Sequence, residues 1–159
     1  MEISQEEEQR YAELQEIALD FAREGSRTEL ENMIRHGLSV NLSTHKDDSL
    51  LMLATYNGHY ETSKMLISNG SDLDRVNMRG QTPLEGVCFK GNLKIVQLLV
   101  ESGAKITDSA MVYAAIFGNK EILDYLKKNA QSKSKEKILG ISMSFIASFV
   151  KKIRSIVRR

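Results

Sequence analysis

The sequence predicts an all-α solenoid of about four stacked helix pairs, and three observations support this. Glycines suited to a reversal between two helices stand at Gly25, Gly58, Gly91 and Gly118. Glycines suited to ending a helix pair stand at Gly37, Gly70 and Gly103. The spacing within each set is 33 residues, except for 27 between the last two reversal glycines. Apolar residues recur at helical spacing between them, and such a fixed period is typical of repeat architectures.

The clearest copy of the unit is the stretch GQTPLEGVCFKGNLKIVQLLVESGA, residues 80–104. Thr82 is placed to N-cap a helix, and Pro83 follows at the first helical position, where an N–H would have no intrahelical partner. Gly91 allows the chain to reverse. Residues 93–100 then place leucine, isoleucine and valine along one face of a second helix. The stretch therefore predicts a turn, a short helix, a reversal and a longer helix.

A helix pair with a 33-residue period and a Thr-Pro-Leu signature resembles the ankyrin repeat. The segments that carry the resemblance are GQTPL, NGH at residues 57–59, and the stops NGSDL and SGAKI. The resemblance implies a β-turn finger and two antiparallel helices in each repeat. We expect an ankyrin domain over residues 1–128, with repeats at about 9–41, 42–74, 75–107 and 108–128.

The two ends of the domain are expected to differ from its middle. Residues 4–24 predict an acidic helix capped by Ser4, which we interpret as an N-terminal cap merged with the first repeat. Its apolar face would comprise Tyr11, Leu14, Ile17, Ala18 and Phe21. In the fourth repeat the finger is mostly deleted, and the two helices are expected at 110–117 and 120–128.

Beyond the repeats, residues 129–137 are polar and aperiodic, which predicts a linker. Residues 138–159 predict a basic amphipathic C-terminal helix. Its uncharged run, 138–150, is 13 residues long, shorter than the roughly 20 that span a bilayer. Two partners for this helix stay open: the last repeat, around Ile122, Leu123 and Leu126, or an anionic membrane surface. The membrane contacts would be Phe145, Phe149, Lys151, Lys152, Arg154, Arg158 and Arg159.

Composition and charge limit the classes of function. The 159 residues include a single cysteine, so a disulfide framework is excluded and a reducing, cytoplasmic location is expected, with membrane association through the tail as the alternative. No N-terminal signal peptide is visible. Residues 1–31 carry ten acidic and three basic side chains, whereas residues 127–159 carry one acidic and ten basic. We do not expect nucleic-acid binding, because the basic tail lacks a recognised motif.

No catalytic constellation is visible in the sequence. The motifs of the nucleophile elbow, the P-loop, the zinc proteases and the paired cysteines are absent. His36 and His59 lie at structural positions of the repeats, and Cys88 lies inside a predicted helix without a histidine partner. We therefore expect neither an enzyme nor a metal site.

The expected function is non-enzymatic binding of another protein. By resemblance to the ankyrin fold, the two residues before each reversal glycine face a concave groove. Aromatic side chains in register along such a groove are suited to an interface hot spot. The groove and finger residues expected to contact the partner are Tyr56, Asn57, Phe89, Lys90, Ile116, Phe117, Arg79 and Gln81.

A narrower resemblance supplies an alternative. The segments SLLMLATYNGH, RGQTPLEGVCFKG and FGNKEILDYL are similar to those of small bacterial ankyrin proteins encoded beside catalase genes. That resemblance implies catalase as a partner and haem as a cofactor. Tyr56 would be the candidate iron ligand, because a phenolate oxygen is a known axial ligand of haem iron. Otherwise we expect no cofactor.

Overall fold

The computed structural model describes residues 4–133, with side chains placed to residue 130. The described chain is all-helical, with one isolated β-bridge between Ser43 and Ser49. Its helices are α1 (Gln5–Glu24), α2 (Arg27–Arg35), α3 (Leu50–Tyr56), α4 (Tyr60–Ser68), α5 (Pro83–Lys90), α6 (Leu93–Glu101), α7 (Asp108–Ile116) and α8 (Lys120–Lys133). The prediction of helix pairs is confirmed throughout this range.

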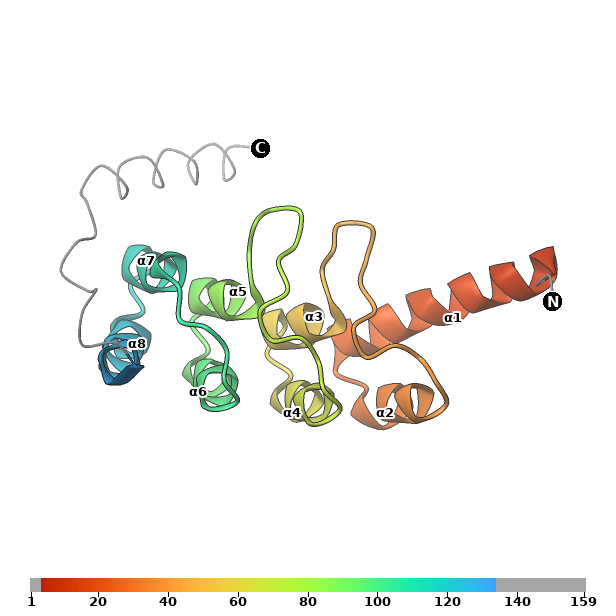
Figure 1. Cartoon of the computed structure of the whole chain (residues 1–159), viewed down its shortest axis with the longest axis horizontal. Coiled ribbons are helices and arrows are strands. Elements are labelled where there is room, and N and C mark those ends of the chain that lie inside the picture. The colour runs from red at the N-terminus through yellow and green to blue at the C-terminus, as the bar shows by residue number, and fades with distance from the viewer. Residues whose placement is uncertain (1–3, 134–159) are drawn as a thin grey trace.

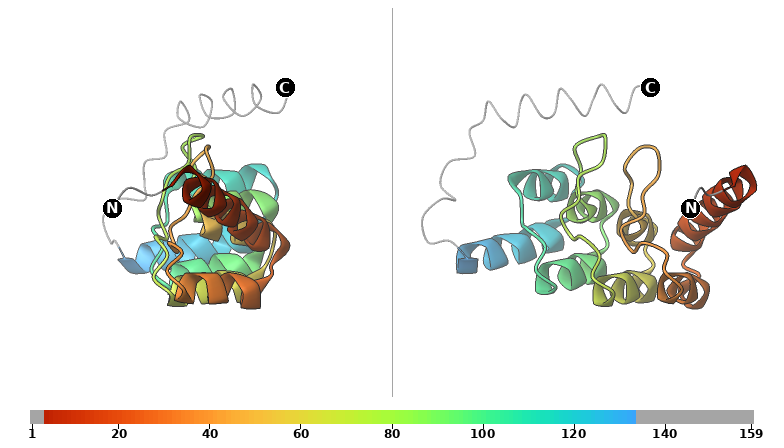
Figure 2. Two further views of the ribbon diagram at one scale, coloured as in Figure 1. Left: turned by 90° about the vertical axis from the view of Figure 1, so that its right-hand side faces the viewer. Right: turned by 45° about the vertical axis from the view of Figure 1, so that its right-hand side comes forward.

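The helices form two parallel rows (Figure 1). The inner row contains α1, α3, α5 and α7, and the outer row contains α2, α4, α6 and α8. Each helix packs against its partner in the pair and against the next helix of its own row. Two long connections, residues 36–49 and 69–82, extend past the inner row as fingers (Figure 2). The arrangement is the expected solenoid of helix-pair repeats.

Local sequence signals position the inner helices. Ser49, Thr82 and Thr107 N-cap α3, α5 and α7, and the hydroxyl of each accepts a hydrogen bond from a backbone N–H in the first turn. Gly91 ends α5 in the left-handed conformation, at φ 80°, which a side chain would disfavour. These caps satisfy backbone groups that a helix end otherwise leaves unpaired.

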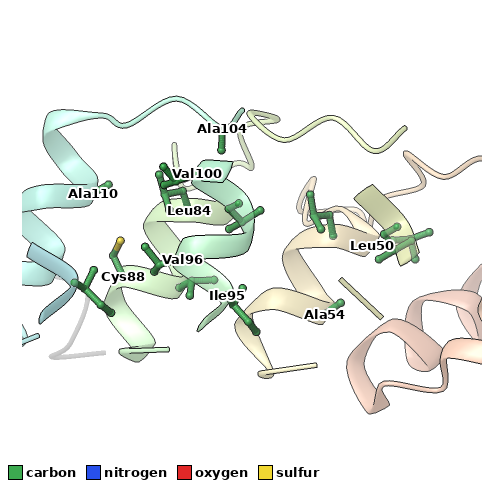
Figure 3. Close-up of a cluster of buried hydrophobic side chains, with 14 of the residues drawn as sticks. Leu50, Ala54, Leu84, Cys88, Ile95, Val96, Val100, Ala104 and Ala110 are labelled. Atoms are coloured by element: carbon green, nitrogen blue, oxygen red, sulfur yellow. The ribbon is translucent and has the colours of Figure 1, made fainter. Parts of the chain in front are cut away.

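A continuous apolar core lies between the two rows (Figure 3). Leu84 and Cys88 of α5 face Ile95 and Val96 of α6, and all four side chains are fully buried. Burial of apolar area is the main source of stability in such a stack. Each repeat contacts only the repeats next to it, so this burial takes place within repeats and between neighbouring repeats.

The first finger is tied to the second by hydrogen bonds that cross the repeat boundary. Arg75 donates to the carbonyl oxygen of Asn41 at 2.9 Å and to the hydroxyl of Ser43 at 2.9 Å. The backbone N–H of Met78 donates to the carbonyl of Lys46 at 3.0 Å. The two fingers therefore form one linked edge beside the inner helices.

Three sequence expectations need correction. The inner helix of repeat four begins at Asp108, not Ala110, because Thr107 supplies the cap. Helix α8 continues to Lys133, into the predicted linker 129–137, because no stop glycine follows this outer helix. Asn129 instead bonds the carbonyl of Tyr125 one turn earlier, at 2.9 Å. The remainder of the linker and the predicted helix 138–159, with Phe145, Phe149, Lys151, Lys152, Arg154, Arg158 and Arg159, lie outside the described residues.

The third correction concerns the N-terminal cap. The capping box of Ser4 and Glu7 is present, as expected. Yet only the last part of α1 reaches the core, where Ala18 and Ala22 are buried, and the first turns extend beyond the stack (Figure 1). The expected core residues Tyr11, Leu14 and Ile17 are about half exposed.

Candidate protein-binding groove

Three aromatic rings form a row across three consecutive repeats. Tyr56 ends α3, Phe89 lies near the end of α5, and Phe117 caps α7. The rings of Tyr56 and Phe89 are parallel with centroids 6.2 Å apart, and Phe89 meets Phe117 edge to face at 4.5 Å. The repeat spacing aligns Tyr56 and Phe89 with Ile116, and Phe117 is the next residue. In the structure Phe117, not Ile116, supplies the ring that meets Phe89. We call Tyr56, Phe89 and Phe117 the aromatic row.

The aromatic row stays accessible although its rings touch. Tyr56 is 40% exposed and Phe117 37% exposed, while Phe89 is half-buried against the core. Ile116 beside Phe117 is likewise 40% exposed. Large rings held by each other lose little conformational freedom on binding, so they are efficient contact groups.

Polar groups expected in the groove flank the row. The ammonium group of Lys90 lies 4.7 Å from the centroid of the Tyr56 ring, within the range of a cation–π contact. Asn57 is exposed, but its amide donates to the carbonyl of Leu53 in its own helix at 2.8 Å. Lys90 therefore gives the row a positive charge, whereas Asn57 serves partly to end α3.

The two finger residues predicted as contacts differ in the structure. Arg79 is exposed and forms an ion pair with Asp48 of the first finger at 3.2 Å. Gln81 is half-buried and donates to the hydroxyl of Tyr113 at 3.0 Å. Arg79 is therefore available at the finger edge, while Gln81 also joins the second finger to α7.

A pocket of about 190 Å³ opens where the fingers meet α3 and α5. One side chain of the aromatic row, Tyr56, forms part of its wall. The complete lining comprises Asp48, Met52, Leu53, Tyr56, Asn77, Arg79, Gln81, Thr82, Pro83 and Gly86. Three of these residues, Tyr56, Arg79 and Gln81, are among the predicted partner contacts, whereas no pattern in the sequence indicates the pocket.

Sequence analysis also missed the role of Glu85. This carboxylate is 4% exposed and completes a capping box with Thr82 by accepting its backbone N–H at 3.0 Å. Its other oxygen accepts the hydroxyl of Thr107, the cap of α7, at 2.7 Å. The spacing of Thr82 and Glu85 could have revealed the capping box, but the contact with the next repeat depends on the stack.

Two of the histidines and the cysteine are engaged structurally. His59 bonds the carbonyl of Arg23 at 2.7 Å, and His36 bonds that of Asn32 at 2.8 Å. Burial, reinforced by the charge of Glu85, raises the pKa of the Cys88 thiol to about 12. Over residues 4–133 no group of three metal-ligating side chains gathers. These geometries agree with the structural roles expected for the histidines and the cysteine.

The surroundings of Tyr56 do not form a haem cradle. Phe89 stacks on its ring and Lys90 lies over it, and the adjoining pocket is below the 300–1,000 Å³ usual for cofactor sites. A macrocycle would therefore lie on the open groove. The residues present do not fit an enclosed haem, and the haem hypothesis stays a prediction.

The comparisons with known proteins agree with this architecture. A family model described as ankyrin repeats (3 copies) matches residues 19–110, which is more than half of the chain. The chain belongs to the ankyrin repeat family. The ankyrin repeat domain of human ASB11 superposes with a TM-score of 0.66 at 32% identity, covering 70% of this chain and 53% of that one.

Curated relatives share parts of the repeat region. A putative ankyrin repeat protein from Pseudomonas aeruginosa is 50% identical over 46 residues, 29% of this chain and 27% of that protein. A Caenorhabditis elegans homologue of transient receptor potential cation channel subfamily A member 1 is 36% identical over 94 residues, 54% of this chain and 8% of that protein. The chain thus spans only a minor part of these relatives. Among the described helices, none has the length and apolar character needed to cross a bilayer.

Proposed function

We propose that this protein is a non-enzymatic binding module that holds another protein in the groove between its fingers and inner helices. The single observation that carries the proposal is the aromatic row, three touching rings of which Tyr56 and Phe117 remain over a third exposed. Ankyrin repeats in general bind other proteins, and such rings are typical hot-spot residues. Catalase, suggested by the resemblance of the sequence, is the first partner to test.

The test compares Tyr56→Ala with Tyr60→Ala. The two tyrosines are similarly exposed, at 40% and 37%, but Tyr60 begins the outer helix α4, away from the groove. The partner is captured from a lysate of the native host, purified and titrated by calorimetry. We expect Tyr56→Ala to weaken binding by about 2 kcal/mol or more, roughly 30-fold, and Tyr60→Ala to leave it unchanged.

Phe89→Ala extends the same test to the centre of the row, with a thermal melt to verify folding because Phe89 also contacts the core. Equal partner affinity in wild type and in Tyr56→Ala/Phe89→Ala, with both folded, would remove the groove from the proposal.

Two further roles follow from the sequence alone. The basic segment 138–159 would tether the module to an anionic membrane surface. Haem, if bound, would use the Tyr56 oxygen. Titration with haemin should then give a Soret band that changes in Tyr56→Phe, which keeps the ring and removes the ligand atom. An unchanged band would assign haem to another residue.

A further inference from the structure

The groove pocket lies where one repeat lacks a side chain that its neighbours have. Counting four residues from the N-caps Ser49, Thr82 and Thr107 gives the equivalent positions Leu53, Gly86 and Met111. Repeats two and four thus carry long apolar side chains there, and repeat three carries glycine. A Cβ at Gly86 would lie 3.5 Å from Cδ2 of Tyr56, so the missing side chain would point at the pocket wall.

Backbone geometry does not explain this glycine. Gly86 lies inside α5 with an ordinary helical φ, unlike the reversal and stop glycines. A Cβ there would make only ordinary van der Waals contact. Glycine inside a helix is destabilising relative to alanine. Gly86 therefore keeps this space open at a cost in folding stability.

We propose that this pocket receives one aromatic side chain, of phenylalanine size, from the protein that occupies the groove. This inference rests on the proposed function, because it names the chemistry by which the groove recognises that partner.

The size and lining of the pocket fit this occupant. Met52, Leu53 and Pro83 contribute apolar atoms, and Gly86 presents a flat backbone surface opposite the ring of Tyr56. The volume, about 190 Å³, slightly exceeds the roughly 150 Å³ of an engineered apolar cavity that holds benzene. A benzyl group therefore has room to enter and to contact the part of the Tyr56 ring that lines the pocket.

The polar groups at the rim argue against a charged occupant. The carboxylate of Asp48 already accepts hydrogen bonds from Asn77 at 2.6 Å and from Arg79 at 3.2 Å. Acid and guanidinium thus neutralise each other within the pocket wall. An uncharged side chain enters without having to replace either of these bonds.

The experiment uses the full chain labelled with ¹⁵N and N-acetyl-phenylalanine amide as the probe. We expect saturable shifts at the amides of Leu53, Gly86 and Gln81, with a dissociation constant on the order of 1 mM, appropriate to one side chain. N-acetyl-leucine amide should bind several-fold more weakly, and N-acetyl-glutamine amide should give no saturable shift.

Gly86→Leu provides the decisive variant. The variant places in repeat three the leucine that repeat two has at the equivalent position, and this side chain should fill the pocket. Its melting temperature should be no lower than that of wild type, because the substitution removes a glycine from a helix. The shifts should disappear in Gly86→Leu and persist in Lys64→Leu, which adds the same side chain on the exposed face of α4. If Gly86→Leu fails to fold, Gly86→Ala serves instead and should reduce the shifts.

Three outcomes would overturn the inference: no saturable shift in wild type, shifts unchanged when Gly86 is filled, or leucine amide binding as well as phenylalanine amide. These outcomes are independent of the groove proposal, which fails only if the Tyr56 and Phe89 variants keep full partner affinity. Once the partner is purified, Gly86→Leu should also weaken its binding by at least tenfold.

Discussion

At the residue scale, Glu85 joins two repeats through a single buried carboxylate. One oxygen pairs with the backbone N–H of Thr82 and the other with the hydroxyl of Thr107. Removing it leaves the buried N–H of Thr82 without its partner, which costs about 1–3 kcal/mol, whereas the half-buried hydroxyl of Thr107 can bond water instead. We expect Glu85→Ala to lower the free energy of unfolding by about 1–3 kcal/mol in urea titrations, and Glu85→Gln to lower it less.

Glu61→Ala, at an exposed position in the first turn of α4, is the matched control and should change stability by only a few tenths of a kcal/mol. A stability loss of the same size in both alanine variants would show that the hydrogen bonds of Glu85 to Thr82 and Thr107 add no stability.

Cys88 makes the stability of the protein depend on pH in the alkaline range. Burial raises the pKa of its thiol from 9.0 to about 12. Below pH 9 the thiol is neutral in both the folded and the unfolded chain. The free energy of unfolding is therefore not reduced by ionisation of Cys88 in this range. Between pH 9 and 12 only the unfolded chain ionises, so the free energy of unfolding falls as pH rises.

Cys88→Ala removes this ionisation while leaving every other group in place. We expect the stability of wild type to fall more steeply than that of Cys88→Ala between pH 9 and 12, measured by urea titration at each pH. Parallel curves would contradict the raised pKa. Native protein should also react slowly with a thiol reagent at pH 8 and rapidly in urea.

At the element scale, side chains that follow the reversal glycines connect one helix pair to the preceding pair. His59 bonds the carbonyl of Arg23 at 2.7 Å, and Asn119 bonds that of Cys88 at 2.9 Å. Each side chain also lies against the preceding reversal glycine, Gly25 or Gly91, so closely that an added Cβ would overlap it. The structural role expected for His59 is thus a bond between two repeats, and the same geometry recurs at Asn119, two repeats later.

His59→Ala should lower the free energy of unfolding by about 1–3 kcal/mol, because it leaves the carbonyl of Arg23 without its partner. His36→Ala is the control, since His36 is exposed and bonds only within its own helix. Gly25→Ala should be more damaging than either, because it combines the overlap with His59 and a φ of 81°. A harmless Gly25→Ala would contradict this account of the repeat junction.

At the scale of the whole molecule, the last repeat is better covered than the sequence suggested. One of the two alternatives for segment 138–159 is docking on repeat four, where it would cover Ile122, Leu123 and Leu126. Ile122 and Leu126 are buried in the core, and only Leu123 is partly exposed. Repeat four therefore has little apolar surface left for docking, and we propose an anionic membrane surface as the partner of the basic segment.

Full-length protein should therefore float with phosphatidylserine vesicles and not with neutral ones, because basic side chains near an anionic surface contribute about 1 kcal/mol each. Deleting residues 138–159 should abolish flotation without lowering the melting temperature. Protein that stays at the bottom of the gradient would exclude the membrane role, and a lower melting temperature after deletion would restore the docking alternative.

The sequence by itself determined the helix pairs, their order and most of their ends. Caps such as Ser49 and Thr82, and glycines such as Gly91, act on backbone groups within a few residues, so their effect can be read locally. The register of Tyr56 and Phe89 followed from the repeat spacing, whereas the contact of Phe89 with Phe117 is visible only in the structure. Over residues 4–133 the predicted elements are present, with ends shifted by a few residues.

Only the tertiary structure decided what lies between repeats. The hydrogen bonds from Glu85 to Thr107 and from Gln81 to Tyr113 join residues that are 22 and 32 positions apart in the chain. The pocket at Gly86 depends on two inner helices, α3 and α5, lying side by side. Helix α1 exposes Tyr11 because no neighbouring helix extends as far, which periodicity within one helix cannot reveal. An apolar stripe specifies the face that a helix can bury, whereas the length and position of its neighbours decide how much is buried.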